Sequence, residues 1–355
     1  MGQTGFNFFH DEPLFGLDIG NSSLKVMQIV MDKSRPPRVV GYGLSGLYTN
    51  CTTEGVITDP KTLGEALLDT LKNHLIGSVD TRRVACTIPS SHTFSRPLKL
   101  PRMADEELKE AVHLEVERYV PMPLDSLYLD YNITIANDKE IELATVAVPR
   151  KIVDSYLDFL GTMGLEPVVL EPTMYALSRL FSSDAASSAP SILVDFGSVA
   201  TDLAVIDRTM LVNSTVSAGI DQVVNSIAQK MNLSPEEARQ LKNEQGVSSS
   251  GSEIADIVKP TLDNLVKEIE KIIRYHNDRN APDHRAIAQV LLSGGGSTMP
   301  GVGEYLSKAL NLPTRMMNPW QKMDFGGLKL PSEFDKSLYL TVAGEAILSP
   351  EEATA

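Results

Sequence analysis

The chain has 355 residues, of which 42% are hydrophobic and 22% are charged, an ordinary globular composition that suffices for about two domains. Its formal net charge of −14 repels phosphate backbones and anionic lipid, which argues against nucleic acid as the main partner and against direct membrane insertion. The two cysteines lack metal-ligand spacing, and no apolar run reaches the ~18–20 residues that span a membrane, so we expect a reduced, cytoplasmic protein.

The N-terminal part of the chain predicts a strand meander, a helix and a buried strand. Residues 15–30 form two β-branched, apolar stretches around a short polar turn, and 39–48 supply a third strand. The apolar residues of 59–74 fall on one helical stripe, and 83–89 have the apolar character of a buried strand.

Residues 91–148 differ in character and are predicted to form a small inserted subdomain. They hold a helix over about 105–119, acidic at its start as the helix dipole prefers, and two strands over 126–135 and 141–149. A helix over 152–163 and a strand over 167–170 follow. Residues 182–190 are small and polar and end in a proline, which is typical of a linker.

After this linker the N-terminal pattern returns. Residues 191–207 repeat the order found at 15–26: an apolar strand, an aspartate, an apolar residue, a glycine, small residues and a second apolar strand. Asp195 follows Asp18 by 177 residues. This internal repeat predicts two homologous halves.

The remainder of the second half is predicted to be largely helical. Helices are expected over 219–231, 234–243 and 259–278, with a flexible serine-rich loop over 248–252. A buried strand over 286–292 then runs into a glycine-rich segment and another helix.

Each of the two hairpin turns carries residues that suit a phosphate group. Small residues let backbone N–H groups approach an anion closely, and an aspartate beside them can hold hydrated Mg²⁺. In the first turn these residues are Asp18, Gly20, Asn21, Ser22 and Ser23, with Lys25 able to reach back from the next strand. The second turn offers Asp195, Gly197 and Ser198. One such turn is most often an ordinary hairpin, but two of them can face each other across a cleft.

A glycine-rich segment at 293–301 is the third element. It follows a buried strand and precedes a helix, so it allows close contact with a flat ligand, and the helix N-terminus favours negative charge. The alternative is an ordinary glycine-rich loop. The chain contains neither the dinucleotide fingerprint at its first strand nor a P-loop.

In this order the segments resemble the five-motif signature of the actin, sugar kinase and heat-shock-70 superfamily. Residues 18–25 and 195–202 resemble its phosphate motifs, 293–301 the adenosine motif, and 170–177 and 339–346 the two connecting helices. The resemblance implies an α/β actin-like ATPase fold of two ribonuclease-H-like halves, with an inserted small subdomain in the first half, that binds ATP and Mg²⁺.

The resemblance also implies roles for individual residues. Asp18 and Asp195 would hold the metal through water, and Glu171 would orient the attacking water. Phosphate would contact the two turns and Lys25, while adenosine would contact Gly294, Gly295, Gly296 and Ser297. Lys242 matches the lysine of a ribose-binding pair, but Arg239 stands where the acid is expected. Ser198, Val199 and Ala200 replace the usual glycines and threonine, so we expect at most slow hydrolysis.

By the same resemblance the first half comprises 1–90, 149–185 and about 336–350, and the inserted subdomain 91–148. The second half comprises 191–335, with its own insertion at about 232–285. The position of the first insertion is similar to that in the cell-division protein FtsA. The sequence segments 95–101, 119–121 and 170–172 resemble the type IV pilus assembly protein PilM family more closely.

This family resemblance implies a cytoplasmic ATP-binding scaffold, peripheral to the inner membrane, whose partner is the N-terminal cytoplasmic tail of a PilN-like membrane protein. The tail would lie in a groove beside the inserted subdomain, with an affinity tuned by nucleotide. Other pilus platform proteins, assembly ATPases and a homo-oligomer stay open as further partners. The alternatives are an FtsA-like filament former, a small-metabolite kinase and an adaptor that binds nucleotide without turnover.

Overall fold

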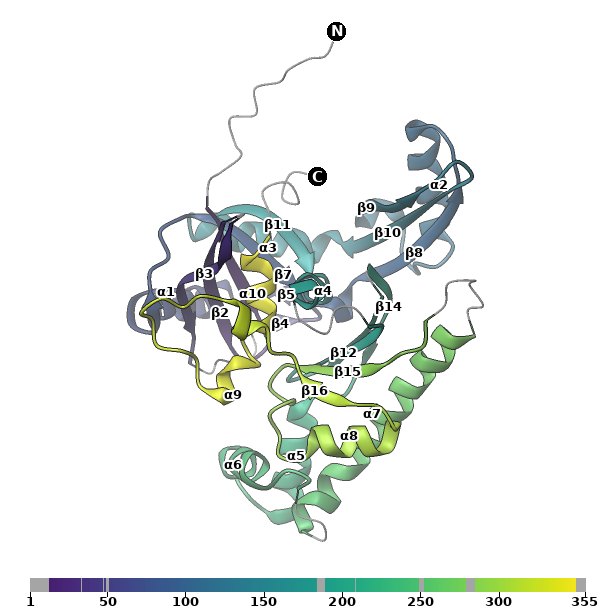
Figure 1. The fold of residues 1–355 in the computed structure, drawn as a ribbon. Coiled ribbons are helices and arrows are strands. Elements are labelled where there is room, and N and C mark those ends of the chain that lie inside the picture. Colours follow the sequence, from purple (N-terminus) through teal and green to yellow (C-terminus); the bar gives the residue numbers. More distant parts are fainter. Residues whose placement is uncertain are drawn as a thin grey trace.

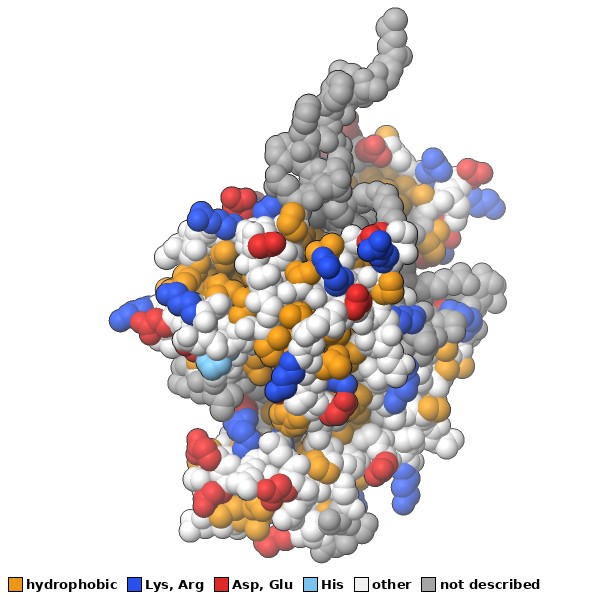
Figure 2. Space-filling view, turned by 60° about the vertical axis from the view of Figure 1, so that its left-hand side comes forward, with side chains coloured by type: hydrophobic (Ala, Val, Ile, Leu, Met, Phe, Trp, Pro, Cys, Tyr) orange, Lys and Arg blue, Asp and Glu red, His pale blue; other side chains and the backbone are white. Residues whose placement is uncertain are grey.

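The computed structural model describes residues 13–32, 34–46, 48, 51–183, 189–207, 209–248, 252–278 and 285–348. Two large sheets lie one above the other, and a small third sheet stands beside them (Figure 1). The side chains of Lys and Arg are interspersed with those of Asp and Glu over the face drawn in Figure 2, so the acidic excess forms no single broad patch there.

The upper sheet is six-stranded, in the order β11-β7-β1-β2-β3-β6. Its strands are β1 (Phe15–Ile19), β2 (Leu24–Asp32), β3 (Arg35–Leu44), β6 (Leu75–Gly77), β7 (Arg83–Ile88) and β11 (Glu166–Pro172). A short hairpin of β4 (Thr52–Thr53) and β5 (Val56–Ile57) precedes α1 (Pro60–Asn73). The apolar sides of α1 and α3 (Arg150–Thr162) pack with β1, β2 and β7 in one buried core.

The lower sheet is five-stranded, in the order β14-β13-β12-β15-β16. It contains β12 (Ser191–Phe196), β13 (Thr201–Asp207), β14 (Thr209–Val216), β15 (Gln289–Ser293) and β16 (Thr314–Met316). An antiparallel meander continues into two parallel strands here, as it does in β3-β2-β1-β7-β11 of the upper sheet. The predicted repeat of strand, turn and strand in each half is therefore confirmed.

Four helices accompany the lower sheet (Figure 1). They are α5 (Ile220–Met231), α6 (Pro235–Gln245), α7 (Glu253–Asn277) and α8 (Val302–Leu310). The apolar faces of α5 and α7 pack against β12 and β13 in a large buried cluster. Among the described helices, none is long and apolar enough to cross a membrane.

The small sheet has the order β8-β10-β9 and consists of β8 (Phe94–Pro101), β9 (Leu127–Ala136) and β10 (Glu140–Pro149). One face is covered by α2 (Asp105–Glu117), which buries Leu108, Val112 and Val116 against the strands. Short 3₁₀ turns at Ser90–His92 (η1) and Leu124–Ser126 (η2) lead into β8 and β9. β8 was not predicted. Prolines such as Pro97 and Pro101 argue against a central strand, but they are tolerated at a sheet edge, where β8 lies.

The start of α7 was also predicted wrongly, at Lys259 instead of Glu253. A proline favours the first helical position, yet Pro260 lies inside the helix. Ser252 caps the true start by accepting a hydrogen bond from the Ala255 N–H, and the buried side chains of Ile254 and Ile257 offset the backbone bond lost at the proline.

Other boundaries differ by a few residues. β3 covers Arg35–Leu44 where the strand was predicted at 39–48, and β15 begins at Gln289 instead of 286. The expected linker at 182–190 begins later, because 182–183 belong to α4 (Thr173–Ser183), and 184–188 lie outside the described residues. Positions 249–251 of the serine-rich loop and the ends 1–12 and 349–355 lie outside them as well.

Two helices, α4 and α10 (Leu340–Ala346), cross near the centre of the molecule, between the two large sheets (Figure 1). They share a core with side chains of both sheets and with the segment that carries η3 (Pro319–Lys322) and α9 (Glu333–Lys336). The helices touch through their backbones, because a Cβ on Gly344 would lie 2.1 Å from the carbonyl oxygen of Ala176. Only glycine permits this approach.

Replacing Gly344 with alanine should therefore lower the free energy of unfolding by about 1–3 kcal/mol, since the methyl group forces the crossing apart. Chemical denaturation measures the change. The matched control is Gly161→Ala in α3, where an added Cβ meets nothing within 4 Å and should stabilise the helix by about 0.5–1 kcal/mol. Equal effects of the two substitutions would contradict the tight crossing.

Candidate functional site

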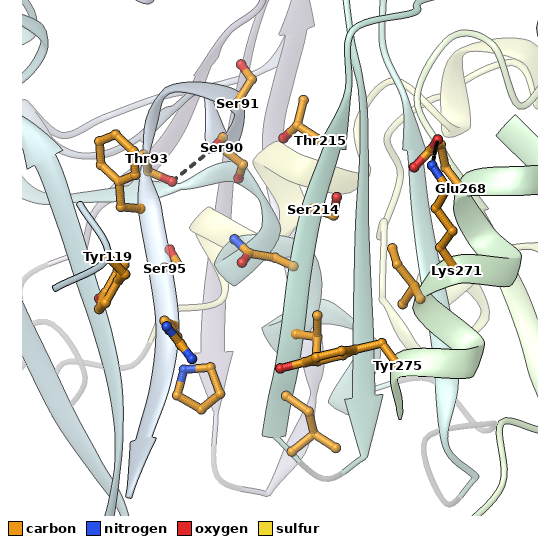
Figure 3. A pocket seen from close by; sticks show the side chains of 17 residues that line it. Ser90, Ser91, Thr93, Ser95, Tyr119, Ser214, Thr215, Glu268, Lys271 and Tyr275 are labelled. Atoms are coloured by element: carbon orange, nitrogen blue, oxygen red, sulfur yellow. Dashed lines mark hydrogen bonds and ion pairs between the residues drawn. The ribbon is translucent and has the colours of Figure 1, made fainter. Parts of the chain in front are cut away.

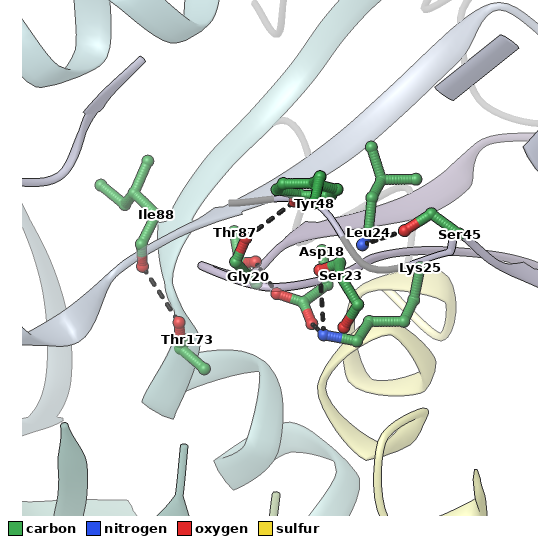
Figure 4. Close-up of polar contacts among 10 residues, drawn as sticks. All are labelled: Asp18, Gly20, Ser23, Leu24, Lys25, Ser45, Tyr48, Thr87, Ile88 and Thr173. Carbon is green, nitrogen blue, oxygen red and sulfur yellow. Dashed lines mark hydrogen bonds and ion pairs between the residues drawn. The ribbon is translucent and has the colours of Figure 1, made fainter. Parts of the chain in front are cut away.

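The turn between β1 and β2 gathers several polar groups around Asp18 (Figure 4). The Lys25 ammonium lies 3.1 Å from Asp18 Oδ2, and the Thr87 hydroxyl donates to Asp18 Oδ1 over 3.0 Å. Both side chains come from strands that neighbour β1, so the carboxylate is fixed from two sides. The turn itself closes through a 3.1 Å bond from Gly20 N–H to the Ser23 carbonyl, and the Tyr48 hydroxyl donates to the Gly20 carbonyl.

The turn between β12 and β13 repeats this backbone geometry. Gly197 N–H donates to the Ala200 carbonyl over 3.1 Å, as Gly20 does to Ser23. Within the described residues, the N–H groups of Asn21 and Ser22 in the first turn, and those of Ser198 and Val199 in the second, donate to no other group. Each turn therefore offers free backbone donors, which suit an anion such as phosphate.

Carboxylates from both turns influence one another. Asp195 and Asp202 are opposite partners in the β12–β13 register, and the Thr215 hydroxyl on β14 donates to Asp202. Burial raises the pKa of Asp195 to about 7, with further contributions from the negative charges of Asp202 and Asp18. Burial also raises the pKa of Asp202 to about 6. Lys25 is the one cation that offsets this pKa shift of Asp195.

A surplus of buried carboxylate favours a bound cation. No cluster of three or more His, Cys, Asp or Glu side chains forms a ready metal cage within the described ranges. Mg²⁺ needs no such cage, because it usually keeps several waters and takes one or two carboxylates together with phosphate oxygens. The residues present therefore fit a hydrated Mg²⁺ that arrives with a phosphate group.

The glycine-rich segment lies directly against the second turn. A Cβ on Gly294, whose φ is +78°, would lie 2.7 Å from Asp195 Oδ1, and Gly296 N–H donates to the Phe196 carbonyl over 2.9 Å. The Ser297 hydroxyl closes the segment by donating to the Gly294 carbonyl over 2.6 Å. The following helix α8 begins at Val302, directly after the segment predicted at 293–301.

Lys242 lies on α6 with an exposed fraction of only 3%. Burial lowers its pKa to about 8, and the neighbouring charge of Arg239 lowers it further, whereas Asp221 on α5 opposes the shift. Arg239 lies 3.7 Å from Asp221 Oδ1. The acid that the superfamily pattern expects at position 239 is thus replaced by an arginine, and an acid from the preceding helix lies next to that arginine.

Glu171, at the end of β11, forms a two-point ion pair with Arg179 of α4, at 2.6 and 2.8 Å. Arg179 also donates to the Gly344 carbonyl over 3.0 Å, which ties the pair to the crossing of α4 and α10. Burial raises the pKa of neighbouring Glu345 well above its usual range, and the charge of Glu171 adds to this shift. The pair braces the crossing, and a water-orienting role for Glu171 stays a prediction.

The sequence predicted that the two turns and the glycine-rich segment contribute to one site, but it did not predict several side chains that contact them. Thr87, Tyr48 and Thr215 act across long sequence distances, which no local pattern reveals. Asp202 did carry a signal, since it follows Asp195 by the seven residues that separate Lys25 from Asp18. Val199, which replaces a usual residue of the second phosphate motif, is 56% exposed.

Known structures share this architecture. A chain titled "PilM-PilN type IV pilus biogenesis complex" aligns with a TM-score of 0.82 at 22% identity, covering 94% of this chain and 97% of that one. EutJ from Carboxydothermus hydrogenoformans gives 0.55 at 16% identity, covering 95% and 90%. MreB5 of Spiroplasma citri bound to AMPPNP gives 0.55 at 13% identity, covering 94% and 95%. The fold is the expected actin-like ATPase fold.

Sequence comparison is more specific than the fold. A curated relative, "Type II secretion system protein L" of Xanthomonas campestris pv. campestris, is 32% identical over 68 residues, which are 19% of this chain and 18% of that protein. The profile of the family described as "Type IV pilus assembly protein PilM" matches residues 16–348. The chain belongs to the type IV pilus assembly protein PilM family.

Proposed function

We propose that this protein is an ATP-binding scaffold of the type IV pilus assembly platform, which binds Mg-ATP between its two halves. The observation that carries the proposal is that the ion pair of Asp18 and Lys25 in one half lies close enough to Asp195, the register partner of Asp202 in the other half, for their charges to interact. A solved structure with the same fold, MreB5 of Spiroplasma citri, is bound to AMPPNP, and another is bound to ADP, which supports a nucleotide in this cleft.

In this proposal Asp18 and Asp195 hold the water shell of Mg²⁺, and the free N–H groups of the two turns bind phosphate oxygens. Bound Mg²⁺ would neutralise phosphate charge. The Lys25 ammonium donates a hydrogen bond to the Ser23 carbonyl over 3.3 Å, which places a positive charge beside the first turn. Gly294, Gly295, Gly296 and Ser297 would contact adenosine. Because Asp18 and Asp195 come from different halves, a shared ligand would favour the arrangement that brings the halves together.

The second part of the proposal is a peptide partner. One structure with this fold is titled as a PilM-PilN complex, so we propose that the cytoplasmic tail of a PilN-like membrane protein binds beside the three-stranded sheet. A depression of about 610 Å³ lies there between β8, β14 and α7 (Figure 3). A smaller one, of about 280 Å³, lies between β8 and the start of α3.

Ser91, Thr93 and Phe94 line both depressions, so the two adjoin each other across the start of β8. The smaller part has apolar walls from Met122, Pro149 and Ile152, which suit apolar side chains of a tail. The larger part is walled by both halves of the molecule, because β14 and α7 belong to the lower sheet and its helices. Binding of the tail in the larger part would therefore depend on the relative position of the two halves. A nucleotide that changes this position would change the affinity for the tail.

The first test is a calorimetric titration of the purified protein with Mg-ATP and Mg-ADP, followed by a phosphate-release assay on the same sample. We expect ATP binding with little or no phosphate release, and a loss of affinity of about tenfold or more in Asp18→Asn, which removes a charge beside the metal. ADP formation that depends on a metabolite, without a matching release of free phosphate, would instead identify a kinase, and pelleting with ATP would identify a filament former.

A second prediction concerns the buried charge at Asp195. Its pKa in the folded protein, about 7, lies above the ordinary value of 3.8, so the folded state binds the proton more tightly. Stability should therefore fall as the pH rises from about 4 to about 7 without metal. Asp195→Asn should show a smaller decline, because Asp202 with its pKa of about 6 still contributes, and it should be more stable than the wild type at pH 8 and lose Mg-ATP binding, as thermal denaturation and calorimetry would measure.

The control for this experiment is Asp138→Asn, which removes an exposed charge in the β9–β10 turn and should change neither property. An Asp195→Asn protein that binds Mg-ATP like the wild type would remove Asp195 from the metal site.

The peptide partner is tested with a fluorescent synthetic peptide of the PilN-like tail and anisotropy. Thr93→Arg places a long cationic side chain in the wall shared by both parts of the groove and should weaken binding about tenfold or more. Thr134→Arg, on the exposed β9 edge of the same sheet, is the matched control and should bind normally. Normal binding by Thr93→Arg would place the tail elsewhere.

A further inference from the structure

Two strand edges form facing walls of the larger depression (Figure 3). Residues 211–215 of β14 line one wall, and residues 94–97 of β8 line another. Successive side chains of a strand point to opposite faces of its sheet, so a run of consecutive lining residues shows that the edge of the strand borders the depression. Among the described strands, β8 pairs only with β10 and β14 only with β13, so both edges are open.

The hydrogen-bond pattern of the lower sheet shows which backbone groups of β14 face the depression. Residues of an antiparallel pair alternate between those that bond to the neighbouring strand and those that point away from it. Gly197 N–H donates to the Ala200 carbonyl, so the next residue, Thr201, directs its backbone groups away from β12. They point instead to Val216, its register partner on β14. Val216 therefore faces β13.

By the same alternation, Asn213 and Thr215 direct their backbone N–H and C=O groups away from β13, to the open edge. The register between β13 and β14 is regular over this stretch, since its shift lies farther along, between Val205 and Ile206. Neither N–H donates to a described backbone group outside the sheet. The edge of β14 thus presents two donors and two acceptors to the depression.

The edge of β14 also lacks the features that usually prevent an edge from pairing. Natural edge strands are protected by proline and by charged side chains, and β14 (Thr209–Val216) contains neither. The opposite edge is different, because Pro97 of β8 has no N–H to donate and the Thr145 hydroxyl already donates to the Arg96 carbonyl over 2.7 Å. Of the two walls, β14 is therefore the one suited to pair with a further strand.

An open strand edge is completed by another extended chain, which bonds to it through its own backbone. Resting on the peptide partner of the proposed function, we propose that the PilN-like tail binds in the larger depression as an added strand, hydrogen-bonded to the backbone of Asn213 and Thr215. The tail then contacts the first half through apolar side chains in the smaller depression and the second half through its backbone. Recognition at β14 excludes proline at the tail positions that face it but tolerates many other residues.

The first test uses fluorescent tail peptides in which one amide at a time is replaced by an ester, which removes an N–H donor without adding bulk. Anisotropy measures their binding to the full chain. Where the tail lies on β14, esters should weaken binding about threefold to tenfold at every second position, because only alternate N–H groups of a strand face one neighbour. Esters at the positions between them should have little effect.

The second test changes the protein. Asn213→Pro removes an N–H at the open edge, where proline is tolerated, and should weaken binding of the unmodified tail about threefold to tenfold. The matched control is Asn213→Ala, which loses the same side chain but keeps the N–H and should bind like the wild type. Thermal denaturation checks that both variants fold. If Asn213→Pro does not fold, the ester series on the wild-type protein decides the question.

The outcomes separate this inference from the proposed function. If the tail binds but no ester weakens binding, or if the losses show no alternation, strand addition is overturned while the peptide partner stands. Equal losses in Asn213→Pro and Asn213→Ala would likewise assign the contact to the side chain and overturn it. If the wild type does not bind the tail at all, the peptide part of the proposed function fails, and strand addition fails with it.

Discussion

Three carboxylates and one lysine meet where the two hairpins approach each other, and the rest of the site follows from that imbalance. Asp18 is paired with Lys25, but Asp195 and Asp202 are opposite each other across a strand pair, where the Thr215 hydroxyl donates to Asp202. In a buried environment such repulsion is strong, as the raised pKa of Asp195 indicates. A cation relieves it, and because Asp18 and Asp195 belong to different sheets, that cation also connects the two halves of the molecule.

The two hairpins share one backbone geometry but not one charge pattern. The register position that holds Lys25 opposite Asp18 holds Asp202 opposite Asp195 in the other half. A ligand between the turns therefore meets two similar sets of backbone donors but a cation on one side only. This asymmetry gives a bound phosphate chain a preferred direction.

The local sequence pattern was enough to predict those parts of the fold that depend on neighbouring residues alone. Strand, tight turn and strand recur at both hairpins because an aspartate, a glycine and small polar residues are needed there, and the repeat revealed two halves. β8 forms a strand despite its prolines because it lies at a sheet edge. The helix α7 begins before Pro260 because Ile254 and Ile257 are buried there. Both features depend on tertiary packing. The same holds for Thr87 on Asp18 and for Arg239 beside Asp221, where partners far apart in sequence, or on different helices, set the chemistry.

The crossing of α4 and α10 has a mechanical consequence. Where helices meet through long side chains, they can slide as rotamers change, but Gly344 against the Ala176 carbonyl leaves no such layer. Sliding of α4 along α10 is therefore disfavoured, and rotation about the contact is the movement that would disturb it least. When a body rotates about a contact point, the displacement of each residue grows with its distance from that point. A turn of a few degrees is barely felt by the helices themselves, yet it shifts α6 and the three-stranded sheet, which lie far from the crossing, by much more (Figure 1).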